Sequence, residues 1–177
     1  MKYRCISAVL GLFILAGCSS LKPEIFSNGT PVLDPVKFFG GHTHSTGVIE
    51  SRNGKPSERI TTKTEGVFAN GILSMEQDLH SENSKPTHRN FKLTIIDAHH
   101  VDATGSDVTG TAHGELYGNY FTWSFRLKVA DKGLVKHVNM TQCMYLMPDG
   151  KTLIIRSIIR KAGIIVKEIT EQFHKDD

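Results

Sequence analysis

The sequence predicts an all-β protein, a single antiparallel β-barrel of about eight to ten strands that follows an export signal and a tether. From residue 38 onward, short β-rich runs alternate apolar with polar side chains, which is the pattern of half-buried strands. Turn signals separate these runs about every ten residues. No proline interrupts residues 57–85 or 87–147, so paired strands can run through both regions. Closure into a barrel removes the exposed edges that an open sheet would leave.

The first residues have the composition of an export signal. Lys2 and Arg4 precede a mainly apolar stretch from Ile6 to Ala16. A helix needs about 20 apolar residues to cross a bilayer, so this stretch is too short to remain as a transmembrane span. We therefore predict a signal peptide over residues 1–17.

The motif Leu15-Ala16-Gly17-Cys18 resembles a bacterial lipobox. That resemblance implies that Cys18 becomes the first residue of the mature protein and carries several acyl chains such as palmitate, enough for a stable anchor. Ser19, rather than Asp, follows the cysteine, and in Gram-negative lipoproteins this resembles release to the outer membrane. We therefore expect a protein anchored in the outer membrane and facing the periplasm. The alternative is an ordinary signal peptide with a chance cysteine.

The charge balance of the mature chain argues against nucleic-acid binding. Loss of Lys2 and Arg4 with the signal leaves 19 of the 21 basic residues, against 18 acidic ones. A nearly neutral chain lacks the basic surface that nucleic-acid-binding proteins present. Cys5 leaves with the signal and Cys18 is acylated, so Cys143 remains alone and no internal disulfide is expected.

The segment after the anchor has the composition of a linker. Residues 19–36 hold three of the six prolines and show little periodicity. Together with Cys18 they are predicted to form a flexible tether over residues 18–36. The barrel domain is then expected over residues 37–177.

Four successive segments show the alternation that places one set of side chains on a single face of each strand. That set comprises Ile60, Thr62, Thr64, Gly66 and Phe68; Leu73, Met75, Gln77 and Leu79; Phe91, Leu93 and Ile95; and Phe121, Trp123, Phe125, Leu127 and Val129. Asn-Gly and Asp-Gly pairs between such segments are strong hairpin signals. The predicted turns are Asn53-Gly54, Asn70-Gly71, Asp131-Lys132-Gly133 and Asp149-Gly150.

Two further stretches differ in composition from these segments. Gly105, Gly110, Gly114 and Gly118 are typical of a tightly bent strand or of bulges at a barrel corner. The last stretch, residues 151–173, is rich in isoleucine. Its β-branched residues and the central Gly163 favour two strands with a turn at residues 161–163. A single amphipathic helix is the alternative.

Four stretches carry a resemblance to a known family. They are "FFGG" at residues 38–41, "GVIESRNGKPSERITTKTEG" from Gly47, "DATGSDVTGTAHGELYGNYFTWSFRL" from Asp102 and "MYLMPDGKTLIIRSIIRKAGIIVKEIT" from Met144. Together they resemble an uncharacterised family of proteobacterial lipoproteins, defined as a domain of unknown function, over nearly the whole chain after the tether. The resemblance implies a calycin-like β-barrel, related in shape to lipocalins, and a connection with lipids.

Two histidines of the sequence are candidate metal ligands. His42 and His44 are two apart and would share one face of a strand, so they could supply half of a metal site. A metal needs about three protein ligands, and nothing in the spacing supplies the others. Surface histidines near the barrel rim are the simpler interpretation.

Nucleophilic catalysis has little support in the sequence. Cys143 is the one thiol expected to stay free in the mature chain, and no charged residue lies next to it to lower its pKa. It is expected to be an inert thiol buried in the core. The chain has no Gly-x-Ser-x-Gly elbow, phosphate-binding loop or Cys-x-x-Cys pair. We therefore expect a protein that is not an enzyme.

Apolar side chains on the predicted inner face could line a ligand cavity, because ligand pockets are mostly apolar with few polar groups. The candidate cavity residues are Phe91, Leu93, Phe121, Trp123, Phe125, Met140 and Met144. The simpler alternative is that these side chains fill the core. The two interpretations differ only in whether the barrel holds empty volume.

These observations lead to three hypotheses. The first is a non-enzymatic protein, without a cofactor, that binds a lipid, a fatty-acid-like molecule or another small apolar ligand in its barrel. The second is a structural or scaffolding lipoprotein with a filled barrel that works through its surface. The third is a metal-dependent enzyme that uses His42 and His44. Membrane contact through the N-terminal lipid is expected, and the sequence points to no particular protein partner.

Overall fold

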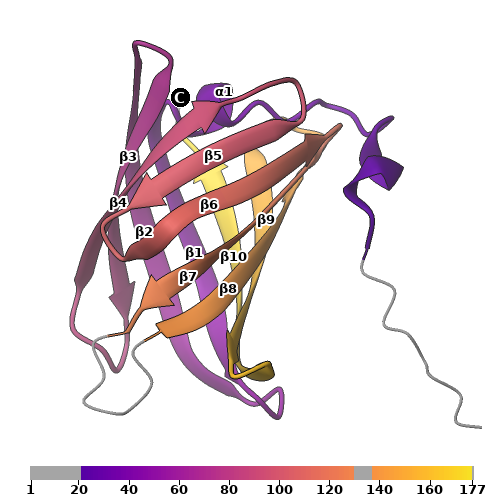
Figure 1. Cartoon of the computed structure of the whole chain (residues 1–177). Coiled ribbons are helices and arrows are strands. Elements are labelled where there is room, and N and C mark those ends of the chain that lie inside the picture. The colour runs from indigo at the N-terminus through magenta and orange to yellow at the C-terminus, as the bar shows by residue number, and fades with distance from the viewer. Residues whose placement is uncertain (1–20, 130–136, 177) are drawn as a thin grey trace, which may run out of the picture.

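A computed structural model describes residues 21–129 and 137–176, and its ten strands close into one antiparallel barrel (Figure 1). Each strand pairs with its neighbours in the sequence, and the first pairs with the last. The strands are β1 (Gly41–Ser51), β2 (Pro56–Ala69), β3 (Ile72–Ser81), β4 (Thr87–Ile95), β5 (His100–Gly105), β6 (Val108–Tyr117), β7 (Tyr120–Lys128), β8 (His137–Leu146), β9 (Thr152–Lys161) and β10 (Ile164–Lys175). The predicted all-β barrel of eight to ten strands is confirmed.

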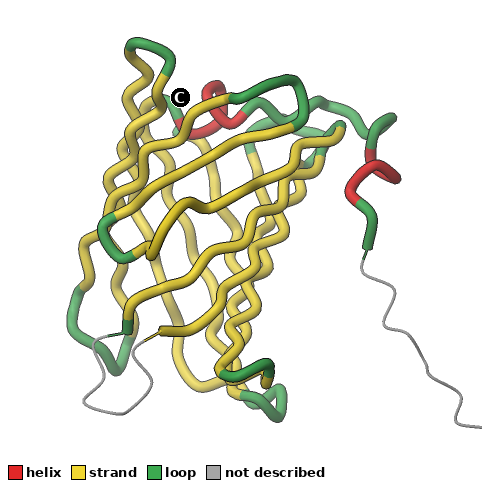
Figure 2. Tube along the Cα trace, in the orientation of Figure 1, coloured by secondary structure: helices red, strands yellow, loops and turns green. Residues whose placement is uncertain are grey.

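Tight turns connect most of the strands, as Figure 2 shows. The predicted turns at Asn53-Gly54, Asn70-Gly71 and Asp149-Gly150 lie between paired strands. Asn70 and Gly71 both have positive φ, 53° and 79°, the conformation that a two-residue hairpin turn requires. The turn predicted at residues 131–133 lies outside the described residues.

The isoleucine-rich segment forms two strands, β9 and β10, and the helical alternative is wrong. The chain reverses at Ala162 and Gly163, which have φ values of 49° and 81°. The glycine-rich segment contains the expected irregularity. The register between β6 and β7 shifts between Thr109 and His113, and Gly110 at this bulge has a φ of 76°.

One short helix, α1 (Pro35–Phe39), lies across one end of the barrel (Figure 1). Asp34 caps it, because its Oδ1 accepts from the backbone N–H groups of Val36 at 2.9 Å and Lys37 at 3.2 Å. Phe38 and Phe39 are buried in the core. We refer to this end of the barrel as the α1 end.

A glycine allows α1 to approach the barrel closely. A Cβ at Gly66 of β2 would overlap the carbonyl oxygen of Phe39. The Nζ of Lys175, at the end of β10, donates to the carbonyl oxygens of Phe38 and Gly40 at 3.2 and 2.5 Å. Both contacts hold α1 over the end of the barrel.

The segment predicted as a flexible tether packs against the barrel over its described part, from Leu21 onward. It contains a short 3₁₀ helix, η1 (Pro23–Phe26), whose Phe26 ring stacks on Tyr120 with centroids 4.4 Å apart. Leu33 is buried, and its N–H donates to the carbonyl oxygen of Gly118 at 2.8 Å. The expectation of a free tether failed because apolar residues among the prolines find partners on β7 and at the α1 end.

Candidate functional site in the barrel interior

All seven candidate cavity residues point into the barrel and are buried. Phe91 and Leu93 come from β4, Phe121, Trp123 and Phe125 from β7, and Met140 and Met144 from β8. They belong to one hydrophobic cluster, which we call the apolar wall. The structure brings them together, and their role in binding a ligand stays a prediction.

Trp123 lies at the centre of the apolar wall. Its ring centroid is 5.3 Å from that of Phe91, 5.4 Å from that of Phe121 and 5.3 Å from that of Phe125. These are the tilted and edge-to-face arrangements that aromatic rings favour. The indole N–H donates to Oε1 of Gln142 at 2.6 Å, and the Gln142 amide donates to Ser157 at 2.8 Å. The one tryptophan therefore also belongs to a buried polar chain.

On the strands from β1 to β4, a row of polar side chains points inward among apolar neighbours such as Met75. Thr43 of β1, Thr64 of β2, Gln77 of β3 and Arg89 of β4 are paired in register, so their side chains form one continuous row. Thr43, Thr64 and Gln77 are buried. Gln77 donates to the Thr64 hydroxyl at 3.1 Å and accepts from Nε of Arg89 at 3.2 Å. We call these four residues the polar row.

Arg89 carries a buried charge at one end of the polar row. Its side chain is 13% exposed, and its Nη1 lies 3.6 Å from Oδ2 of Asp107. Burial lowers the pKa of Arg89, an effect that the carboxylates of Asp107 and Glu171 oppose. The guanidinium carbon also lies 5.1 Å from the centroid of the Phe91 ring, where the polar row meets the apolar wall.

Glu171 of β10 provides a second buried charge. Its Oε1 accepts from the hydroxyls of Ser45 at 2.7 Å and Thr62 at 2.9 Å. Gly47 faces it on β1, and a Cβ there would collide with the Glu171 side chain. The absence of a side chain at Gly47 therefore makes room for the Glu171 side chain.

One buried hydroxyl in the polar row is unsatisfied. The Thr43 Oγ1 has no hydrogen-bond partner among the described residues, although Thr43 is only 2% exposed. An unpaired buried polar group costs about 1–3 kcal/mol. Such a group in a barrel interior fits a position where a ligand or an ordered water supplies the missing hydrogen bond.

Sequence reasoning missed the polar row as a site. The alternation correctly put Thr62, Thr64 and Gln77 on the same face as their apolar neighbours. The presence of these three polar residues at inward positions was the signal that could have indicated a polar site. Arg89 was missed because the predicted strand began at Phe91, two residues later. Phe68, predicted on the inner face of β2, lies beyond the buried part of the strand and is half exposed.

The metal candidates lie outside the barrel. His42 and His44 are exposed on the outer face of β1, in a groove of about 660 Å³ that also contains Asp176. His44 Nδ1 lies 2.6 Å from Oδ1 of Asp176. Within residues 21–129 and 137–176, no group of three or more His, Cys, Asp or Glu side chains could hold a metal ion. The geometry therefore gives the metal hypothesis no support.

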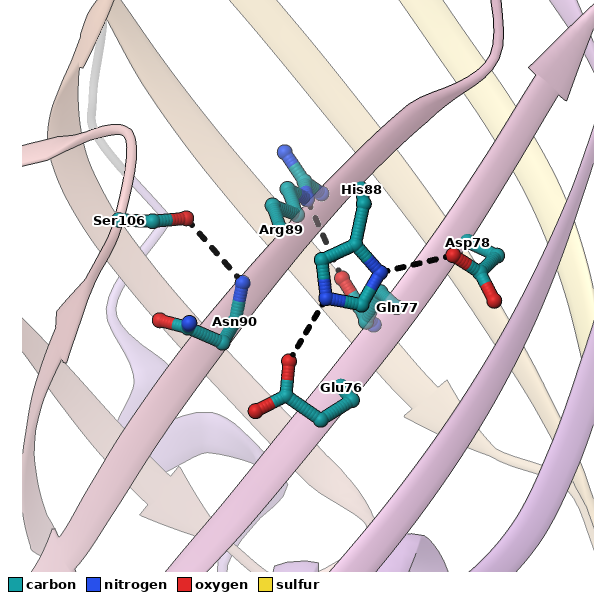
Figure 3. A network of polar contacts seen from close by, with 7 residues as sticks. All are labelled: Glu76, Gln77, Asp78, His88, Arg89, Asn90 and Ser106. Atoms are coloured by element: carbon teal, nitrogen blue, oxygen red, sulfur yellow. Dashed lines mark hydrogen bonds and ion pairs between the residues drawn. The ribbon is translucent and has the colours of Figure 1, made fainter.

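Figure 3 shows that His88 and Arg89, which are neighbours on β4, point to opposite faces of the sheet. His88 lies outside, between two carboxylates of β3. Its Nδ1 is 2.8 Å from Asp78 and its Nε2 is 3.0 Å from Glu76. Because ionised carboxylates only accept hydrogen bonds, these contacts favour a doubly protonated imidazolium. The hydrogen bond to Asp78, followed by that to Glu76, raises the pKa of His88.

We expect a proton NMR titration of the protein to give His88 a midpoint above that of an unperturbed histidine. Since the folded-state pKa is the raised one, His88 adds stability at a pH below its unfolded pKa and loses this contribution as pH rises through the folded value. The Glu76→Gln/Asp78→Asn variant should return the midpoint towards the ordinary value. An unchanged midpoint in that variant would contradict the bridging geometry.

The prediction of a core position for Cys143 is wrong. Gln142 and Met144, on either side of it, point inward, so Cys143 lies half-buried on the outer face of β8. Its Sγ is 3.8 Å from Oγ1 of Thr122 on β7. The alternation along β8 places it there, as it does Thr141 and Tyr145.

A family model described as "Protein of unknown function (DUF3833)" matches residues 12–175, which is most of the chain. The chain belongs to the DUF3833 family. The expected membership of a family defined as a domain of unknown function is thereby confirmed. No curated protein matches this DUF3833 chain.

One solved structure similar to this DUF3833 chain is "Structure of S-type Phycobiliprotein Lyase CPES from Guillardia theta". The superposition has a TM-score of 0.59 and covers 89% of this chain and 99% of that one, with 11% sequence identity. At that identity the likeness concerns the fold, and it supports the expected calycin-like barrel. No helix in the described part of the DUF3833 chain is long and apolar enough to span a membrane.

Proposed function

We propose that this protein is a non-enzymatic, lipid-anchored binding protein that holds a small amphipathic molecule inside its barrel. The division of the interior into an apolar wall and a polar row is the observation that carries the proposal. Ligand sites are mostly apolar, with a few placed polar groups that orient the ligand. Here an acyl chain or ring system would pack on the apolar wall, and its polar head would reach the polar row.

The polar row argues for a ligand rather than for a purely structural core. Burial of a hydroxyl, an amide and a guanidinium costs free energy unless each is hydrogen-bonded. Thr43 lacks such a bond among the described residues, and Arg89 has more donors than its contacts with Gln77 and Asp107 use. A hydroxyl or carboxyl head could pair with either of the two, which lie at opposite ends of the polar row. The likeness to a phycobiliprotein lyase fits binding of a small ligand without indicating which one.

The anchoring part of the proposal rests on the sequence. The lipobox resemblance at Cys18 and the short export signal support acylation, and Ser19 supports sorting to the outer membrane. These residues lie outside the described ones. Metabolic labelling of the full chain with radioactive palmitate should mark the wild-type protein and leave the Cys18→Ala variant unlabelled. A labelled variant or an unlabelled wild type would overturn the anchor.

Trp123 gives a direct test of binding in the barrel, because it is the one tryptophan of the chain and is buried in the apolar wall. The purified full chain is titrated with a brominated fatty acid and with the matching brominated alcohol. Bromine quenches tryptophan only at close contact, so binding inside the barrel should quench Trp123 emission to saturation. Quenching by the acid alone would indicate a carboxylate head, and quenching by both would indicate any hydroxyl-bearing head.

The absence of saturable quenching by either probe, with a circular dichroism spectrum of a folded β-protein, would overturn the binding proposal. That result would favour the scaffold hypothesis, in which the interior is filled with side chains. Native mass spectrometry of the same samples checks the stoichiometry, since one barrel should hold one ligand.

Thr43→Val tests whether the unsatisfied hydroxyl of the polar row contacts the ligand. Valine keeps the shape and removes the unsatisfied hydroxyl, so the ligand-free protein should become more stable by about 1–2 kcal/mol in urea unfolding. If the hydroxyl contacts the ligand head, the same variant should bind the brominated probe about fivefold more weakly. Greater stability together with weaker binding is a combination that a structural role alone would not produce.

Thr62→Val is the matched control. The Thr62 hydroxyl donates to the buried carboxylate of Glu171, so its removal should lower the free energy of unfolding by about 2 kcal/mol. If Thr43→Val lowered stability as much as Thr62→Val, the Thr43 hydroxyl would have a partner in the folded protein. The assignment of that hydroxyl to the ligand would then be wrong.

A further inference from the structure

Exposed apolar side chains gather at the α1 end of the barrel. Six of them line its rim, from the chain before α1, the β2–β3 hairpin and the β4–β5 connection: Val32, Val67, Phe68, Ile72, Ile95 and Ile96. We call these six residues the apolar rim. Their exposed fractions run from 38% for Ile72 to 69% for Val32. Among the described residues, Ile164 at the β9–β10 turn is the one exposed large apolar side chain at the opposite end.

The rim also borders an apolar groove. Phe68 and Ile95 line a groove of about 390 Å³ beside α1, together with Leu33, Pro35 and Leu116, and the acidic residues Asp34 and Asp97 also border it. Apolar surface collected at one end of a barrel, on strand ends and on the connections beside them, is uncommon for a protein that is surrounded by water. A partner that covers this end must therefore be apolar over an extended area.

The N-terminal segment indicates which partner this is. Leu21 is three residues beyond Cys18, and three residues of extended chain span at most about 10 Å. The η1 segment cannot swing far from the barrel, because Phe26 stacks on Tyr120 and lies 5.8 Å, edge to face, from Tyr145. An acyl anchor on Cys18 therefore brings η1, and the barrel with it, close to the lipid headgroups.

The η1 segment joins the barrel next to the α1 end. Its ring partner Tyr120 begins β7 and Tyr145 lies near the end of β8, both at the end of the barrel that α1 covers (Figure 1). Leu21 and Ile25 of this segment are themselves exposed, at 52% and 65%. Leu21 and Lys22 line a groove on the outer face of β5, β6 and β7 together with His100, His113 and Ser124, so the anchored segment leaves the wall of the barrel between its α1 end and its middle.

We propose that the apolar rim inserts into the surface of the membrane to which the protein is anchored. This inference rests on the proposed acylation of Cys18. The rim side chains enter the boundary between headgroups and acyl chains, as the apolar faces of interfacial proteins do. The barrel then stands with its α1 end on the lipid and the β9–β10 turn away from it. A second copy of the chain is the competing occupant.

The test uses the full acylated chain, with Cys143→Ser, in vesicles of phosphatidylethanolamine and phosphatidylglycerol. An environment-sensitive fluorophore is attached at Ile96→Cys or, as the matched control, at Ile164→Cys. Both side chains are exposed to a similar extent, 57% and 52%, so labelling should not disturb the fold. The label at position 96 should emit at shorter wavelength, and aqueous iodide should quench it several-fold less than the label at position 164.

Equal quenching at the two positions in vesicle-bound protein would overturn the rim insertion and leave the anchor intact. Vesicle flotation of the same samples reports the anchor separately, so protein that fails to float counts against acylation instead. Shielding at position 96 that disappears when the protein is diluted in lipid would show contact between copies, and would also overturn the proposal. Shielding that persists on dilution supports it.

Discussion

Arg89→Met is expected to lower the free energy of unfolding by about 3 kcal/mol, because it leaves Asp107, in the β5–β6 turn, without its partner. The value is at the lower end of the range for broken buried ion pairs, because the Asp107 side chain is 29% exposed to solvent. The Oδ1 of Asp107 already lacks a partner among the described residues, which leaves little to compensate the lost guanidinium. Urea unfolding followed by circular dichroism measures the change.

The double variant Arg89→Met/Asp107→Asn separates pairing from packing. If the ion pair accounts for the loss, removal of both charges should restore part of the stability, and the double-mutant cycle should show coupling of more than about 1 kcal/mol. Strictly additive effects would contradict the pairing. In the brominated-probe titration, Arg89→Met should also reduce affinity for the acid more than for the alcohol, if the ligand head is a carboxylate.

Gly66→Ala is expected to displace α1 from the end of the barrel. The added Cβ would overlap the carbonyl oxygen of Phe39, a backbone atom that cannot rotate away. Overpacking of this kind costs typically about 1–3 kcal/mol, and we expect a loss near the upper end. Displacement should expose Phe38 and Phe39 and increase binding of a hydrophobic dye.

Hydrogen exchange localises this effect. The Gly40 N–H donates to the Val36 carbonyl oxygen at 2.9 Å, and its protection should fall in Gly66→Ala while that of β7 amides is retained. Thr61→Ala, at an exposed position of the same strand, is the matched control and should change stability by less than about 0.5 kcal/mol. If the two variants behaved alike, close packing of α1 on β2 would not be the reason for the glycine.

The barrel could be predicted because the signals for its strands and turns lie within short stretches of the sequence. Alternation along β2, β3, β4 and β7, together with Asn-Gly and Asp-Gly turns, predicts each of these strands and shows which of its residues face inward. The C-terminal pair β9 and β10 followed from β-branched residues and Gly163. The apolar wall followed from the same alternation, since residues such as Phe121 and Trp123 are both apolar and periodic.

The polar row could not be predicted in the same way, because its members are far apart in the sequence. Thr43, Gln77 and Arg89 become neighbours only through the register of four strands, and register is set by turns and bulges rather than by residue type. Docking of the η1 segment was missed for a similar reason. Phe26 lies in a proline-containing stretch without periodicity, and its partners Tyr120 and Tyr145 come from distant strands.

The seam between β1 and β10 has a consequence for when this protein can fold. It pairs Thr43 with Lys175 and Ser51 with Lys167, so the two ends of the barrel domain must meet before the last edge closes. Contacts between such distant residues form slowly, because a long loop must be ordered first. A chain that emerges from a translocation channel N-terminus first cannot complete the barrel until β10 has followed. If Cys18 is acylated as proposed, the anchor would reach the membrane before the barrel is closed, and the fold would be completed beside the lipid surface.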